Sequence, residues 1–485
     1  MKRQHGLILA TVALLCGPMA WSQSFTNSAL NPPGDSQQNG LPAGPQPLAT
    51  YSAQNGSQDN PQDSSQQGSS GPQELFTHPE QLPPLNLFRE VTSHTGVTFN
   101  TTVGDLVQYN SGGSGYSRYW SNLSSASAGV NIFQSRSDLV WNLTYTGGLS
   151  QSTAASYNYS NLNQFAAARI VWRFAKRWQL RIKDSFLYSD DPFQPFLTYL
   201  GNPAPNNPNP AIYLPQNVLE QNQGDVDLTY LLGKHDTLNF IGGESFQHYL
   251  RGAPSSLWNS TTYTGGAFYQ HNFSARLAAG GGYTFTALDF GHGASRAGVQ
   301  MLEGFAAYSF SPRTTLSGWV GPELTNTKDA VPIFCLGNGC LYEILHNHFV
   351  NLAEGATFRW QASSSNSFGL DFSHQVTNGG GVLGAVNYYQ VAATYSRPLT
   401  RAWSLGAGYV YSSSLSVSGF RADQYLYGSQ GTVGVSRRVF NDAWTLNAYY
   451  AFIHQSQNYF GLPATLTTSG LGFTLRYVWD HPFGR

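Results

Sequence analysis

The sequence predicts an all-β protein, a transmembrane up-and-down antiparallel β-barrel of about 18 strands with a disordered N-terminal tail. Segments with apolar side chains at every second position recur along the chain, joined alternately by tight and by long connections. The chain is poor in charge (11%) and rich in aromatic residues (14%), whereas globular chains carry about 25% charged residues. Beyond the first 22 residues, no run approaches the ~20 apolar residues of a membrane helix.

The chain begins with the pattern of a secretory signal peptide, residues 1–22. Two basic residues follow the first methionine, residues 6–15 form an apolar core, and Ala20-Trp-Ser22 fits the small-x-small cleavage rule. Cys16 lies near the position of a lipoprotein cysteine, but the residue before it is a leucine rather than a small residue. The signal peptide is therefore favoured over a lipoprotein leader.

Residues 23–84 are of low complexity and are dominated by Gln, Ser, Asn, Pro and Gly. Such a segment cannot bury enough apolar surface to offset the entropy lost on ordering. We expect a disordered periplasmic tail. A solvated spacer is the simpler interpretation, and a docking segment for a periplasmic or cell-wall partner is the alternative.

From residue 85 to 485 the pattern is uniform, and this region is the predicted barrel. Tight and often basic connections lie at 135–138, 175–177, 233–236, 274–276, 311–313, 363–366, 397–401 and 440–443. Longer polar connections lie at 106–122, 151–161, 190–221, 250–260, 291–296, 328–346, 378–384, 416–422 and 458–466. This alternation predicts short periplasmic turns, long extracellular loops and both termini on the periplasmic side. The first strand, near 96–106, has the weakest pattern.

Aromatic residues gather near the ends of the expected strands, on the apolar face. Pairs such as Trp178/Leu180 and Trp444/Leu446 directly follow tight turns. Trp and Tyr rings favour the membrane–water interface because they are partly apolar and partly polar. A soluble β-sandwich or propeller also alternates, but here the apolar face carries almost no charge. The strands are also close to the 9–11 residues that a tilted membrane strand needs.

If the apolar face meets lipid, the polar face must line the lumen. The charged residues predicted to line the pore are Arg169, Arg173, Arg181, Lys183, Asp225, Asp227, Glu303, Arg359, Asp371 and Arg476. The first four are cations on adjacent strands and would favour anionic solutes. The two aspartates on the neighbouring strand can instead pair with these cations, and both interpretations stay open.

Three acidic residues contradict simple alternation, because Asp184, Glu244 and Glu354 fall on the lipid-facing side. Glycines adjoin two of them, so we expect β-bulges that turn Glu244 and Glu354 inward. No such neighbour explains Asp184.

Two cysteines lie close together in a predicted loop, Cys335 and Cys340 with Gly-Asn-Gly before the second. In an oxidising compartment this spacing favours a small disulfide loop. A metal pair or free thiols are the alternatives, and no further metal ligands are evident.

The segment from Ser469 to Trp479 has the clearest strand pattern of the chain. Leu471, Phe473, Leu475, Tyr477 and Trp479 lie on one side of it. At the end of a secreted chain, this segment resembles the closing strand of Gram-negative outer-membrane β-barrel proteins of the porin-like type. The resemblance implies insertion into outer-membrane lipid by the barrel-assembly machinery. That family usually ends on a phenylalanine, whereas here Phe483 is followed by two residues.

The expected width and polar interior favour a channel for small hydrophilic solutes or an exported polymer. The alternative is a barrel plugged by its loops that acts as a structural or surface-binding protein, with the 190–221 loop and the tail as candidates. No Gly-x-Ser-x-Gly elbow or phosphate-binding loop occurs, so neither an enzyme nor a cofactor is predicted. A formal net charge of -1 does not suggest a nucleic-acid partner. The oligomeric state stays open.

Overall fold

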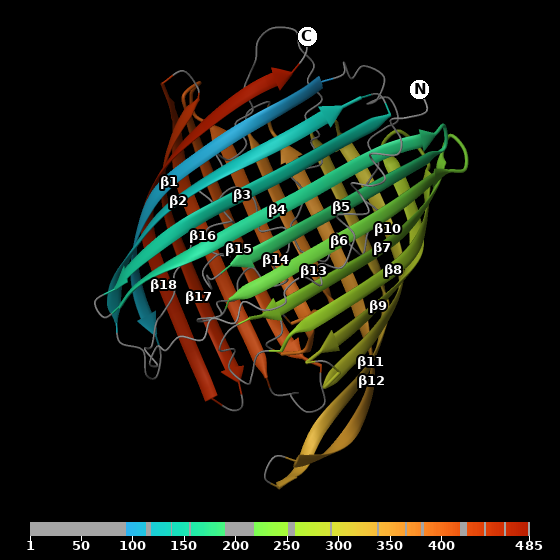
Figure 1. Ribbon diagram of the computed structural model, residues 1–485. Helices are drawn as coiled ribbons and strands as arrows, with labels where there is room; N and C mark the ends of the chain where they lie inside the picture. Colours follow the sequence, from blue (N-terminus) through green and yellow to red (C-terminus); the bar gives the residue numbers. More distant parts are fainter. Residues whose placement is uncertain are drawn as a thin grey trace, which may run out of the picture. The chain divides into compact units, whose positions relative to one another are not determined.

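A computed structural model shows one closed sheet of 18 antiparallel strands (Figure 1). It describes residues 94–483 except 113–117, 137, 155–156, 190–217, 251–257, 292, 337–338, 364–365, 380–382, 418–423, 441–442 and 460–461. The predicted signal peptide (1–22) and tail (23–84) lie outside the described residues. Within the described part of the chain, no helix is long and apolar enough to cross a membrane.

The strands follow the order of the chain. The first nine are β1 (His94–Gly112), β2 (Tyr119–Ser135), β3 (Leu139–Ala154), β4 (Tyr157–Ala175), β5 (Trp178–Ser189), β6 (Leu219–Leu231), β7 (Asp236–Tyr249), β8 (Ser260–Asn272) and β9 (Leu277–Phe290). The others are β10 (Ser295–Ser311), β11 (Thr314–Leu336), β12 (Gly339–Gln361), β13 (Ser367–Asn378), β14 (Ala385–Pro398), β15 (Trp403–Ser416), β16 (Tyr425–Val439), β17 (Trp444–Tyr459) and β18 (Leu462–Phe483).

Pairing between the first and last strands closes the barrel. β1 pairs with β2 on one side and with β18 on the other, in continuous register from Thr95↔Phe483 to Gly112↔Leu466. Closure leaves no sheet edge, so backbone N–H and C=O groups can be satisfied within the sheet where no water is available. The last strand runs past Trp479 to Phe483, further than its side-chain pattern indicates.

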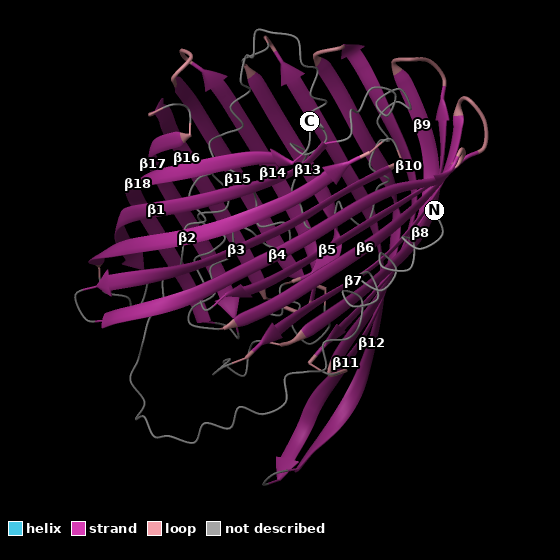
Figure 2. Ribbon diagram, turned by 45° about the horizontal axis from the view of Figure 1, so that its top comes forward, coloured by secondary structure: helices cyan, strands magenta, loops and turns pink. Residues whose placement is uncertain are grey.

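All eight predicted tight turns join an even-numbered strand to the next one, as expected. The predicted positions of the long loops are partly wrong. Most of 106–122, 151–161 and 328–346 is strand, and β11 and β12 extend well beyond their neighbours as a two-stranded ribbon (Figures 1 and 2). These segments do not follow the regular alternation of a membrane strand, and in the ribbon Ile333, Tyr342 and Ile344 are exposed among polar residues. Their backbones still pair across the three hairpins.

The predicted apolar face is the outer surface of the sheet. In β18, Leu471, Phe473 and Trp479 are 52%, 51% and 43% exposed, whereas Thr474 on the opposite face is 2% exposed. Side chains of this size left exposed on every second position fit contact with hydrocarbon rather than with a second protein layer.

An aromatic belt follows the tight-turn rim on the outer face. The ring centroids of Trp172 and Phe174 are 5.4 Å apart, those of Phe174 and Trp178 6.3 Å, and those of Trp178 and Tyr230 4.4 Å. Trp444 and Tyr477 pair in the same way at 4.8 Å. Such a belt marks one membrane interface.

A lysine placed in the middle of the outer face tests this assignment. Val433→Lys in β16, where Val433 is 45% exposed, is expected to cost about 2–4 kcal/mol, because the ammonium group would lie in hydrocarbon. Phe440→Lys, at a turn residue that is 79% exposed, should cost less than about 1 kcal/mol at the interface. Urea unfolding of the barrel refolded into lipid vesicles measures both, and equal effects would contradict a lipid-facing wall.

Candidate pore lining

A row of charged side chains crosses the inner wall from β4 to β6. Arg169 is the register partner of Lys183, and Lys183 is the register partner of Asp225. Alternation places all three on the face opposite Trp172 and Val226, which are 41% and 46% exposed to the outside. The predicted inward orientation of these charges therefore agrees with the register.

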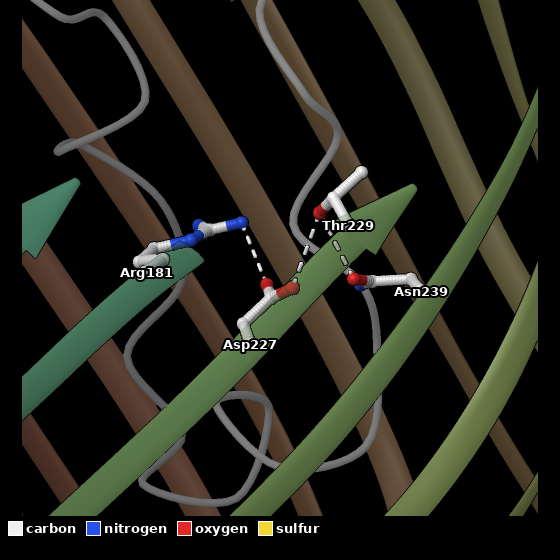
Figure 3. Close-up of polar contacts among 4 residues, drawn as sticks. All are labelled: Arg181, Asp227, Thr229 and Asn239. Carbon is white, nitrogen blue, oxygen red and sulfur yellow. Dashed lines mark hydrogen bonds and ion pairs between the residues drawn. The ribbon is translucent and has the colours of Figure 1, made fainter. Parts of the chain in front are cut away.

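The next row contains a buried ion pair. The Arg181 guanidinium lies 2.8 Å from the Asp227 carboxylate, and both side chains are largely buried. The second Asp227 oxygen accepts a hydrogen bond of 3.3 Å from the Thr229 hydroxyl, which also donates to Asn239 Oδ1 at 3.0 Å (Figure 3). Pairing of cation with aspartate, one of the two sequence-based interpretations, thus describes Arg181.

A second ion pair lies on the inner face of β12 and β13. Arg359 contacts both carboxylate oxygens of Asp371, at 2.8 and 3.0 Å, and the Thr357 hydroxyl donates to the same carboxylate at 3.0 Å. Two-point contact holds the guanidinium and the carboxylate in one geometry. These predicted residues form part of a braced wall.

The remaining predicted residues are separated around the barrel. Arg173 follows Trp172 in β4, where the pairing with β5 becomes irregular. Glu303 in β10 is 3% exposed and is the register partner of Gly282. Arg476 in β18 lies between Thr102 and Thr445. The structure does not gather the ten residues into one cluster.

The loop end of the β13–β14 hairpin turns into the lumen. Val376 and Ala385 pack against the inward side chains of β9 and β10, in a cluster with Leu288, Phe290, Ala297 and Val299. The Asn378 side chain donates to the Ser260 hydroxyl of β8 at 2.8 Å. The hairpin therefore spans from its own place in the wall to strands on the other side of β11 and β12, and it narrows the barrel there.

Glu323 of β11 supports this inward turn. The β12–β13 ladder stops at Glu354↔His374, so the backbone N–H of Val376 has no partner in β12. Both carboxylate oxygens of Glu323 accept from that N–H, at 3.1 Å each. The side chain replaces a ladder bond where the two strands diverge.

A second apolar cluster lies on the inner face where the barrel closes. Leu106, Leu123, Tyr449 and Ile453 are at most 4% exposed. Gly472 beside them leaves room for the Tyr449 ring, because a Cβ there would lie 2.3 Å from ring atom Cζ. The alternating pattern does not predict these inner clusters. The sequence indicates them only through apolar residues at inward positions that should be polar, as at Leu288 and Phe290.

The outward acidic residues correct a sequence-based expectation. β7 pairs with β6 and β8 without a register shift, and so does β12 with its neighbours at Glu354. No bulge turns Glu244 or Glu354 inward. The adjoining glycines instead continue the regular register of the strands. Asp184 also faces outward and accepts a 3.2 Å hydrogen bond from the Asn222 amide, which lowers the cost of its position.

Cys335 and Cys340 are register partners near the tip of the β11–β12 ribbon. Directly paired residues of antiparallel strands have Cα atoms about 4.5–5.5 Å apart, within the range that a disulfide spans. Their placement suits the predicted disulfide, which stays a prediction. Among the described residues, no group of three or more His, Cys, Asp and Glu could hold a metal ion.

Comparison with known proteins adds the following. No protein-family model and no curated protein matches the sequence. Similar solved structures include OpdL of Pseudomonas aeruginosa (13% identity, 80% of this chain and 99% of that chain, TM-score 0.36). OccAB4 of Acinetobacter baumannii is 10% identical, with 80% of this chain and 99% of that chain covered and a TM-score of 0.38. OccK2 (OpdF) of Pseudomonas aeruginosa in complex with glucuronate is 11% identical, with 78% of this chain and 98% of that chain covered and a TM-score of 0.38. These likenesses are low both in sequence identity and in TM-score.

The closed antiparallel sheet, the apolar outer face and the polar inner face belong together. A soluble barrel would not leave so many large apolar side chains in contact with water. The protein is a transmembrane β-barrel of the outer-membrane type.

Removing one partner of the Arg181–Asp227 pair tests its burial. Asp227→Asn is expected to cost about 3–5 kcal/mol, because it leaves a buried guanidinium without its counter-charge. Arg181→Met combined with Asp227→Leu should cost much less, since no buried charge remains. The exposed pair Arg296–Asp289, whose side chains are 64% and 35% exposed, is the matched control and should contribute less than about 1 kcal/mol. Urea unfolding in vesicles measures all variants, and equal costs for the two pairs would contradict a buried bridge.

Proposed function

We propose that the barrel is a channel for small hydrophilic solutes across the outer membrane. The observation that supports it best is the charged inner wall formed by Arg169, Lys183 and Asp225, in one row on three adjacent strands. A sheet of 18 strands is too wide to be filled by its own side chains and ordinarily leaves an aqueous lumen.

The charge balance of this wall favours anions. Arg169, Arg173, Arg181 and Lys183 bring four positive charges to β4 and β5, and β6 brings Asp225 and Asp227. These six residues carry four positive and two negative charges, with Arg181 bound to Asp227. A positive patch on a low-dielectric wall raises the local concentration of negatively charged solutes.

The inward turn of the β13–β14 hairpin favours small solutes over an exported polymer. Val376 and Asn378 lie against β8, β9 and β10 rather than in the wall. Because the hairpin divides the cross-section of the lumen, single small solutes fit through it more easily than an exported polymer chain.

Conductance across a planar bilayer tests the channel. The refolded protein is expected to give unitary currents, with a reversal potential in a KCl gradient that indicates a preference for chloride. Arg169→Gln with Lys183→Gln should move this potential toward potassium, because two wall cations are lost.

The matched control is Lys176→Gln with Arg177→Gln, which removes the same charge from the exposed turn between β4 and β5. It should leave the reversal potential unchanged. Absence of any unitary current would count against a channel. A current whose selectivity ignores the wall variant would count against the proposed lining.

The second candidate is a barrel closed by its own hairpin and acting through its outer surface. The packing of Val376 across the lumen favours it, together with the β11–β12 ribbon that extends beyond the neighbouring strands (Figure 2). The predicted plug at 190–221 falls almost wholly outside the described residues.

Loosening the hairpin separates the two candidates. Glu323→Ala with Asn378→Ala removes the acceptor for the Val376 N–H and the contact with Ser260. A channel narrowed by this hairpin should conduct more per opening in the variant. Asn447→Ala, which removes a 2.9 Å hydrogen bond to Thr474 elsewhere on the inner wall, is the control and should not change conductance. A barrel silent before loosening and conducting after it would favour the closed form.

A further inference from the structure

A group of basic side chains lies on the outer face of β10, β11 and β12, toward the loop end. Arg296 is the register partner of Lys328, and Lys328 is the register partner of His346. His348 lies two register pairs nearer the tight turns, opposite Asn326, with which its ring shares a hydrogen bond. We call Arg296, Lys328, His346 and His348 the outer basic patch.

The patch faces away from the lumen. Even-numbered residues are the more exposed ones along this part of the three strands, and odd-numbered residues are buried or only partly exposed. Leu324 and Val350, on the same face and nearer the tight turns, are 48% and 71% exposed. Each member of the patch is therefore on the outer face of the barrel.

The patch lies on the loop side of an apolar stretch of β12, and the ribbon beyond it is apolar again on this face at Ile344 and Tyr342, which are 63% and 58% exposed. From Trp360 to Val350 the outward positions of β12 are apolar except for Glu354. Ten residues of a strand tilted by about 40° rise about 25 Å along the barrel axis, which is the height of the apolar band of such barrels. The basic residues thus reach the level of the lipid headgroups on the loop side.

Arg296 and Lys328 give this patch its positive charge. Strands in a sheet are about 4.8 Å apart, and like charges directly opposite one another are destabilising. Asp289 of β9 contacts Arg296 through Nε at 2.9 Å, but the Arg296 side chain remains 64% exposed. Lys328 and the two imidazoles next to it add further donors on this face. A group with several negatively charged oxygens would fit between them.

We propose that the outer basic patch binds the phosphate-bearing headgroup of a lipid in the outer leaflet. A free anion would not contact the exposed side chains of Leu324 and Val350. A phosphorylated lipid can place its acyl chains on these two residues and its phosphate on Arg296 and Lys328. Basic residues next to a membrane surface attract such headgroups. The site is independent of any transport through the lumen.

Native mass spectrometry of the full barrel in mild detergent tests the proposal. The probes are bisphosphorylated lipid A and the same lipid after enzymatic removal of its phosphates. Wild-type protein should retain the phosphorylated form, and the dephosphorylated form should bind at least about tenfold more weakly. An excess of inorganic phosphate should not displace the lipid, because its apolar contacts add to the binding.

Arg296→Gln with Lys328→Gln should weaken retention of the phosphorylated lipid by about tenfold or more. Arg276→Gln with Arg313→Gln removes two exposed cations from tight turns at the opposite rim and should leave retention unchanged. Heat-modifiability on a gel reports whether each variant is folded, and the comparison of the two lipids needs no variant at all. Equal binding of both lipids, displacement by inorganic phosphate, or unchanged retention in the folded patch variant would overturn the proposal.

Discussion

Inside a bilayer, the backbone of this chain must satisfy its hydrogen bonds without help from solvent. No water is available there, so each N–H and C=O must find a partner in the chain. The sheet meets this demand by closing on itself between β1 and β18, over a continuous register. Closure then divides every strand into one face toward lipid and one toward the interior.

The interior face shows how such a wall is stabilised without a conventional core. Arg181 with Asp227 and Arg359 with Asp371 hold neighbouring strands through charged contacts. Apolar clusters alternate with these contacts, as at Leu106. The β12–β13 ladder stops at Glu354↔His374, and Glu323 bridges the point where these two strands diverge. The inward hairpin therefore follows from the same demand that closes the barrel.

Much of the fold could be predicted because side-chain alternation and turn chemistry are local. The eight tight turns, the number of strands and the apolar face of β18 all follow from neighbouring residues. Predictions were wrong where the local pattern and the backbone disagree. The loop ends of β11 and β12 pair as strand although their side chains do not follow the alternation of a membrane strand. Glu244 stays outward because its strand keeps a regular register.

Alternating apolar side chains are a property of each strand, and they set the class of fold and the face of most charges. Glu244 and Glu354 are exceptions, because the expected bulges do not form. Which of the inward charges meet depends on how the strands are paired in the folded barrel. Arg181 and Asp227 are 46 residues apart along the chain, and the turn of Val376 toward β9 and β10 depends on strands distant in sequence. Alternation fixes a side chain's face because it is a property of one strand. Contact between side chains depends on the register between strands, which no single segment encodes.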